Sequence, residues 1–258
     1  MSAPAPQELW LNHADSPALP AAIKTGGVPD DIHTGSPDLH WLASARPASP
    51  GAPGAEWLTG VERRCKRAVD VIGAAFGLLL AAPLMAAVAL VIVLDSRGPV
   101  FYRTYRVGQR GKLFPFYKFR TMVCQAETLL EEVRSLNERE KILFKVAEDP
   151  RLTRMGGFLR KYSLDELPQL WNILIGDMSL VGPRPPMAAE YEQFRPEHRR
   201  RTVAPPGLTG LWQVTARTDP SFERYAGLDC EYVDRWNLWL DLKILCKTIP
   251  AVLLGTGQ

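Results

Sequence analysis

The sequence predicts a helix-rich α/β (α+β) domain that is associated with a membrane through one apolar helix near its N-terminus. The 24 residues 71–94 contain no charged side chain. A helix of that length reaches roughly 36 Å, enough to cross an apolar bilayer core of about 30 Å. Two short segments at 100–106 and 113–120 have strand character around a turn at 108–111. Most other apolar residues recur at helical spacing.

The first 60 residues predict a disordered, Pro-rich tail. Residues 1–56 hold nine of the 22 prolines, two basic and six acidic side chains, and no useful apolar periodicity. Residues 57–258 carry a net charge of +7, which suits an anionic membrane or phosphate-rich substrates but is equally typical of an ordinary surface. We therefore expect three regions: a tail at 1–60, a membrane helix at 61–96 and a domain at 97–258.

The apolar segment fits two membrane topologies equally well. Pro83 lies at its centre, where it removes a helical hydrogen bond and favours a break. Basic residues flank the segment on both sides, namely Arg63, Arg64, Lys66 and Arg67 before it and Arg97, Arg103, Arg106, Arg110 and Lys112 after it. Positive charge at both ends favours a cytoplasmic position for both. A helix that enters, breaks and returns satisfies these observations, while a kinked span stays open.

Further elements follow from the spacing of apolar residues. Residues 125–145 predict an acidic amphipathic helix, and residues 167–174 predict a helix that ends before Gly176. A Pro-rich loop at 181–186 precedes a helix at 187–195, and a turn at 205–207 precedes a strand at 211–215. Residues 238–254 are apolar but contain Asp241, Lys243 and Lys247. This fits an amphipathic helix in the membrane interface, or a core helix, better than a second span.

Two adjacent carboxylates, Asp165 and Glu166, lie where the helix before Gly176 is predicted to begin. A helix N-terminus beside Arg160 can gather phosphates and keep carboxylates ionised. The alternative is structural, because Ser163 followed by Glu166 has the spacing of a capping box.

Basic residues stand in two other clusters. The glycines and prolines of residues 176–186 predict a rigid loop that holds Arg184, and a fixed guanidinium suits a diphosphate. Alternation in residues 117–122 places Lys118 and Arg120 on one face of a strand. The loop with Arg184 also fits a structural turn, and the pair Lys118 and Arg120 also fits an ordinary exposed strand face. The Gly-rich turn at 206–214 is by itself a weak signal of function.

In this order the segments resemble the bacterial sugar transferase family, also called monotopic phosphoglycosyl transferases, and most closely its short members that begin exopolysaccharide assembly. The resemblance runs from about Arg63 to the C-terminus. It is carried by Lys66-Arg67 with Asp70, by Lys118-Phe119-Arg120-Thr121-Met122, by Leu164-Asp165-Glu166-Leu167-Pro168-Gln169-Leu170, and by residues 176–185, 206–214 and 228–244.

The resemblance implies a re-entrant anchor with its break at Pro83 and a catalytic domain on the cytoplasmic face of the inner membrane. It implies transfer of a hexose-1-phosphate from a UDP-sugar to polyprenyl (undecaprenyl) phosphate, with release of UMP. Asp165 would be the nucleophile, and Glu166 would bind a magnesium ion (Mg²⁺) together with Asp165. Phosphate-binding positions would be Lys118, Arg120, Arg160 and Arg184, with Asp229 nearby.

The sequence departs from the family in two places, since Ala82 stands where a serine usually precedes Pro83, and Pro205 stands where a basic residue is common.

Two other functions compete with sugar-phosphate transfer. A transferase that passes the sugar alone and releases UDP often holds its metal with Asp-x-Asp, which this sequence lacks. A non-catalytic membrane scaffold would need no carboxylate pair beside arginines. Glucose or galactose is favoured over an N-acetylhexosamine, no nucleic-acid partner is expected, and a homo-oligomer is left open.

Overall fold

The structure is a computed structural model that describes residues 57–126, 128–129, 133, 146 and 149–255. The chain divides into two units, 1–46 and 47–258, and the first lies outside the described residues. The predicted tail at 1–56 and most of the predicted helix at 125–145 also lie outside them. Trp57 and Leu58, which we assigned to the tail, instead pack on the body: the Trp57 indole donates to the Val233 carbonyl at 2.9 Å, and Leu58 is buried.

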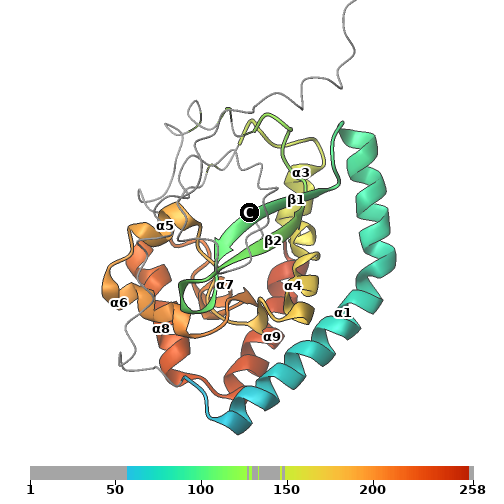
Figure 1. The fold of residues 1–258 in the computed structure, drawn as a ribbon. Coiled ribbons are helices and arrows are strands. Elements are labelled where there is room, and N and C mark those ends of the chain that lie inside the picture. Colours follow the sequence, from blue (N-terminus) through green and yellow to red (C-terminus); the bar gives the residue numbers. More distant parts are fainter. Residues whose placement is uncertain (1–56, 127, 130–132, 134–145, 147–148, 256–258) are drawn as a thin grey trace, which may run out of the picture. The chain divides into compact units, whose positions relative to one another are not determined.

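Short helices and two small sheets follow one long helix (Figure 1). The α-helices are α1 (Gly60–Asp95), α3 (Gly156–Lys161), α4 (Gln169–Ile175), α5 (Ala188–Glu192), α6 (Pro196–Arg199), α7 (Leu211–Thr215), α8 (Phe222–Arg235) and α9 (Leu238–Leu253). The 3-10 turns are η4 (Gln109–Gly111), η6 (Leu164–Glu166) and η7 (Arg200–Val203). The strands are β1 (Phe101–Val107), β2 (Leu113–Phe119), β3 (Ser179–Val181) and β4 (Gly207–Thr209).

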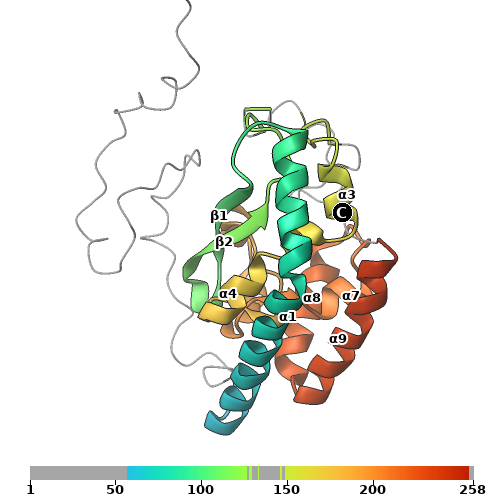
Figure 2. The same cartoon turned by 90° about the vertical axis from the view of Figure 1, so that its right-hand side faces the viewer.

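Helix α1 contains the predicted apolar segment, but it is one helix and not two. It begins with a capping box between Thr59 and Glu62 and continues through Pro83 to Asp95. Proline removes a single backbone hydrogen bond, so the turns on either side can remain helical while the axis changes direction. Figures 1 and 2 show that the α1 axis is bent. The expected break is therefore a bend in this structure.

Polar side chains near the start of α1 attach it to the body. The Lys66 ammonium donates to Asp241 of α9 at 2.7 Å, and both side chains are buried. Asp70 accepts from the hydroxyl and the backbone of β3, at Ser179 (2.9 Å) and Leu180 (2.8 Å). Figure 2 shows α1 in front, with α4 on one side of it and α9 on the other.

The remainder of α1 combines a packed face with an apolar exposed one. Val88 and Ile92 pack with Phe119 and Leu159 in one buried cluster. Ile72, Phe76, Leu79, Leu80, Leu84, Leu90, Val93 and Leu94 are exposed. Among the described residues, α1 is the helix long and apolar enough to cross a membrane.

One sheet joins two neighbouring strands of the chain, and the other joins strands that are further apart in the sequence. Strands β1 and β2 are antiparallel, as the predicted hairpin requires, and pair Lys118 with Tyr102. Strands β3 and β4 are parallel and pair Ser179 with Gly207. A Cβ at Gly207 would lie 2.1 Å from the Gly182 nitrogen, so this crossing requires glycine.

Two predicted elements change type or extent. Residues 211–215, predicted as a strand, form α7, while the strand lies earlier at β4. The apolar residues of this short stretch fit either periodicity, and the close approach at Gly207 decides where the backbone pairs. The helix predicted at 187–195 is α5 and ends at Glu192. Helix α4 confirms the predicted stop, because Gly176 ends it with a φ of 102°.

Candidate active site

Asp165 and Glu166 lie in the turn η6, between α3 and α4. Ser163 precedes them in the left-handed region, with a φ of 54°, and its side chain caps no helix. The capping-box alternative is therefore wrong for this structure, because α4 begins only at Gln169. Asp165 is 4% exposed, and the Glu166 side chain is 20% exposed. The pair is thus held in a strained turn rather than used to start a helix.

Lys118 of β2 contacts both carboxylates. Its Nζ lies 2.9 Å from Glu166 Oε1 and 3.4 Å from Asp165 Oδ2. Asn172 of α4 supports this arrangement, since its Nδ2 donates to the Pro115 carbonyl at 2.6 Å and its Oδ1 accepts from the Tyr117 amide at 3.3 Å. The strand that carries Lys118 is therefore fixed to the helix that follows the carboxylates.

Three guanidinium groups act on the same pair. The charges of Arg184 and Arg217 act to lower the pKa of Glu166. The charge of Arg160 acts to lower the pKa of Asp165. Arg160 is oriented by a hydrogen bond from its Nε to Thr121 at 3.0 Å. The structure thus brings together Asp165, Glu166, Lys118, Arg160 and Arg184 from the sequence-based set.

The two carboxylates have different electrostatic environments. Burial would raise the pKa of Glu166, but Lys118, Arg184 and Arg217 outweigh it and hold that pKa at about 2. Burial raises the pKa of Asp165, with Lys118 opposing and the charge of Glu166 adding to the rise. Neighbouring groups whose pKa values are pushed apart are a hallmark of acid, base and nucleophile sites.

The loop before α5 positions Arg184 through its backbone. The backbone amide of Arg184 donates to Asp229 Oδ2 at 3.2 Å, and the backbone carbonyl of Arg184 accepts from Arg201 Nη2 at 2.7 Å. Asp229 and Arg201 form a fully buried ion pair, and Arg201 also donates to Tyr225. Burial, opposed by Arg201, raises the pKa of Asp229 to about 6. Asp229 therefore supports the loop that carries Arg184.

Arg120 has a structural location. It is 6% exposed, and its guanidinium donates to the Ser96 carbonyl at 2.7 Å and to the Arg97 carbonyl at the end of α1. Strand β2 ends at Phe119, so the alternation that would keep Arg120 beside Lys118 does not extend to it. Arg120 therefore binds carbonyls at the end of α1 rather than the carboxylate pair, and its predicted role in phosphate binding stays a prediction.

Arg201 and Arg217 were not predicted from the sequence. Arg201 lies in a run of three arginines, 199–201, which resembles an ordinary charged surface. Arg217 lies after α7 in a segment without any motif. Arg201 pairs with Asp229, 28 positions further along the chain, and Arg217 influences Glu166 of a different turn. No local spacing signals either contact.

The two carboxylates suit Mg²⁺ in their chemistry. Mg²⁺ prefers oxygen ligands and is commonly held by one or two carboxylates together with substrate phosphates and water. Asp165 Oδ2 and Glu166 Oε1 already converge on one cation, the Lys118 ammonium. In the described part of the chain no cluster of three His, Cys, Asp or Glu side chains could hold a metal alone. The residues present therefore fit an ion that is shared with a substrate.

Comparison with known proteins identifies the family. The family model described as bacterial sugar transferase matches residues 61–255. The chain belongs to the bacterial sugar transferase family. This sugar transferase is 43% identical over 197 residues to the exopolysaccharide production protein ExoY of Rhizobium meliloti, covering 75% of this chain and 87% of that protein.

Longer relatives match the same region. The undecaprenyl-phosphate galactose phosphotransferase of Salmonella typhimurium is 44% identical over 200 residues, which are 76% of this chain and 42% of that protein. The galactosyl transferase CpsE of Streptococcus agalactiae is 43% identical over 196 residues, 74% of this chain and 43% of that protein. This sugar transferase thus matches less than half the length of these two relatives.

Proposed function

We propose that this sugar transferase moves a hexose-1-phosphate from a UDP-sugar to polyprenyl phosphate and thereby initiates exopolysaccharide or related glycan assembly. The carrying observation is the pair formed by the buried Asp165 and the half-buried Glu166. Lys118 donates to both carboxylates, and the charges of three arginines act on them. Cations around a carboxylate suit a reaction at a diphosphate, where the substrate brings several negative charges. The relatives, which include an undecaprenyl-phosphate galactose phosphotransferase, support the same reaction.

Asp165 is the nucleophile in this proposal. One of its Oδ atoms forms a bond to the sugar-bearing phosphorus, and the bond from that phosphorus to the oxygen of the departing UMP breaks. An oxygen of the lipid phosphate then attacks the same phosphorus and releases the Asp165 carboxylate. Burial that raises the pKa of Asp165 makes its carboxylate more basic and hence more nucleophilic.

The basic residues around the carboxylates stabilise negative charge in this proposal. Lys118 and Arg184 stabilise the charge that moves onto the departing phosphate, and the charge of Arg160 favours the ionised form of Asp165. Glu166, held ionised by a pKa of about 2, and Asp165 would hold Mg²⁺. When bound, this ion offsets part of the diphosphate charge.

Product analysis tests the reaction. Purified protein, undecaprenyl phosphate and a panel of UDP-sugars should yield UMP and a lipid-linked sugar diphosphate. UDP as the product would instead identify a transferase that moves the sugar alone, and no turnover with any sugar would favour a scaffold. The panel also distinguishes glucose, galactose and N-acetylhexosamines.

The role of Glu166 has its own test. Glu166→Gln should cripple turnover, and raised Mg²⁺ should partly restore it, because an amide oxygen is a weaker but still usable ligand. An unchanged rate at all Mg²⁺ concentrations would assign Glu166 a role other than metal binding.

We further propose that α1 is a re-entrant anchor and that the domain lies on the cytoplasmic face of the inner membrane. The bend of α1, its exposed apolar face and the basic residues at both ends support this topology. The amphipathic α9 would lie in the interface. A single cysteine near position 40, with the native cysteines replaced, should be protected from labelling in intact spheroplasts. External labelling would mean that α1 spans the bilayer.

A further inference from the structure

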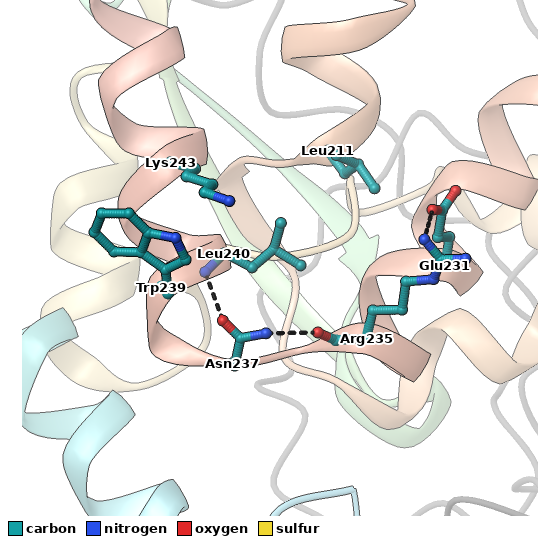
Figure 3. A pocket seen from close by; sticks show the side chains of 7 residues that line it. All are labelled: Leu211, Glu231, Arg235, Asn237, Trp239, Leu240 and Lys243. Atoms are coloured by element: carbon teal, nitrogen blue, oxygen red, sulfur yellow. Dashed lines mark hydrogen bonds and ion pairs between the residues drawn. The ribbon is translucent and has the colours of Figure 1, made fainter.

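A surface pocket lies between α7, α8 and α9 (Figure 3), and neither Asp165 nor Glu166 lines it. Its volume is about 250 Å³. Leu211 and Leu240 provide apolar walls, while Arg235 and Lys243 reach it from opposite sides. None of these residues contributes to the proposed active site.

The pocket combines cationic and apolar groups. Lys243 Nζ lies over the Trp239 ring, 5.5 Å from its centroid, and in the described part of the chain no carboxylate lies within ion-pair distance of it. Arg235 pairs with Glu231 at 3.0 Å, but the two side chains are 75% and 41% exposed. An exposed pair of this kind is weak and leaves the guanidinium accessible to a stronger anion.

The location of the pocket identifies the class of anion. Helix α9 exposes an apolar row that includes Leu238, Trp239, Leu242, Ile249 and Leu253. The same helix is joined to the apolar helix α1 by the buried Lys66–Asp241 pair. Trp and Lys side chains beside such a row are typical of the zone where lipid headgroups meet acyl chains.

We propose that this pocket binds the phosphate headgroup of an anionic bilayer phospholipid. Lys243 and Arg235 would contact the phosphate, Trp239 would lie at the level of the headgroups, and Leu240 and Leu211 would contact the upper acyl chain. Such a lipid would hold α9 at a fixed depth beside α1. The inference rests on the membrane association proposed above and not on the transfer reaction.

Lipid retention tests this site. Full-length protein is reconstituted in nanodiscs of phosphatidylcholine mixed with phosphatidylglycerol, extracted in mild detergent, and its co-purifying lipids are quantified by mass spectrometry. Wild-type protein should retain phosphatidylglycerol in preference to phosphatidylcholine. The double variant Arg235→Gln/Lys243→Gln should lower that preference roughly 5- to 30-fold, from about fivefold for each basic residue near an anionic surface.

Matched variants make the result specific. Lys247→Gln removes the same charge one turn further along α9 but does not line the pocket, so it should retain the wild-type preference. Lys243→Arg should retain it too, and melting temperatures should show that every variant folds. The proposal that this pocket binds an anionic phospholipid would be wrong if the double variant kept the preference for phosphatidylglycerol. It would also be wrong if Lys247→Gln lowered that preference as much as the double variant does. Protein that does not enter nanodiscs at all would overturn membrane association instead.

Discussion

Two lysines in this molecule each act on two carboxylates, yet their surroundings differ. At the joint between α1 and the body, Lys66 pairs with Asp241, and its charge opposes the burial that raises the pKa of Asp70. At the candidate site, Lys118 contacts Glu166 and Asp165. At the joint, further protein donors bind the acids: Tyr232 (2.8 Å) and Trp236 (3.1 Å) donate to Asp241, and Ser179 and Leu180 donate to Asp70.

The carboxylates beside Lys118 retain free acceptor capacity. Among the described residues, Lys118 is the donor to both Asp165 and Glu166. A carboxylate has about four acceptor positions, so a substrate or metal ion can still be accommodated there. The comparison teaches that residue type does not separate these two ion clusters, whereas the number of protein donors to each carboxylate does.

The largest expected effect is on the nucleophile. Asp165→Asn should lower turnover at least about a thousandfold and abolish the phosphosugar adduct, because an amide cannot attack phosphorus. Asp70→Asn is the matched control at the joint and should leave turnover per folded molecule within a few-fold of wild type. UMP release and mass spectrometry of the trapped adduct check both. A phosphosugar adduct trapped on the Asp165→Asn variant would remove Asp165 as nucleophile.

Exchanging the two lysines for methionine should separate stability from activity. Lys66→Met leaves Asp241 and Asp70 buried without their cation, so we expect about 3–5 kcal/mol lower stability. Lys118→Met affects a side chain that is 21% exposed and should chiefly lower turnover. Denaturation midpoints and rates per folded molecule measure the difference. Equal destabilisation by both variants would contradict the comparison.

Arg184→Lys should have a smaller effect. Lysine retains the charge but loses the guanidinium fork, and loss of a charge-assisted hydrogen bond costs about 1.5–3 kcal/mol, or roughly 10- to 150-fold in rate. Arg120→Lys also replaces a guanidinium, but at the end of α1, and should lower the melting temperature rather than the turnover. Full activity of Arg184→Lys would mean that this residue only braces its loop.

Local patterns predicted much of this fold. The absence of charge in 71–94, the strand character of 113–120 and the glycine after Ile175 are each properties of one continuous segment, and all correspond to observed elements. The prediction of a strand at 211–215 was wrong, because so short an apolar run fits the period of a helix as well as that of a strand.

The site was predictable only in part. The order of its motifs singled out Asp165, Glu166, Lys118 and Arg184, but spacing alone suggested a capping box that does not form. The joint could not be derived from local patterns, because Lys66 and Asp241 are separated by 175 positions. The support of Arg184 by Arg201 depends in the same way on tertiary contacts.

Asp229 forms a buried ion pair with Arg201 and also accepts a hydrogen bond from the backbone amide of Arg184. Through that amide it can affect the position of Arg184 in the site. Its pKa is raised from 3.8 to about 6, so the folded state binds this proton more tightly than the unfolded state. Its ionisation therefore costs stability as the pH rises from about 4 to about 6.

Activity should respond in the opposite direction. Below pH 6 the neutral carboxyl is a weaker acceptor for the Arg184 amide, and the rate should fall roughly 2- to 12-fold, from about 0.5–1.5 kcal/mol for one hydrogen bond. Asp229→Asn should have this lowered rate already at neutral pH and lose the step near pH 6. An acid limb from Asp165 should remain in both proteins, because its own pKa is raised. If Asp229→Asn keeps both the wild-type rate and the wild-type step, the buried pair serves stability alone and the loop is positioned by other contacts.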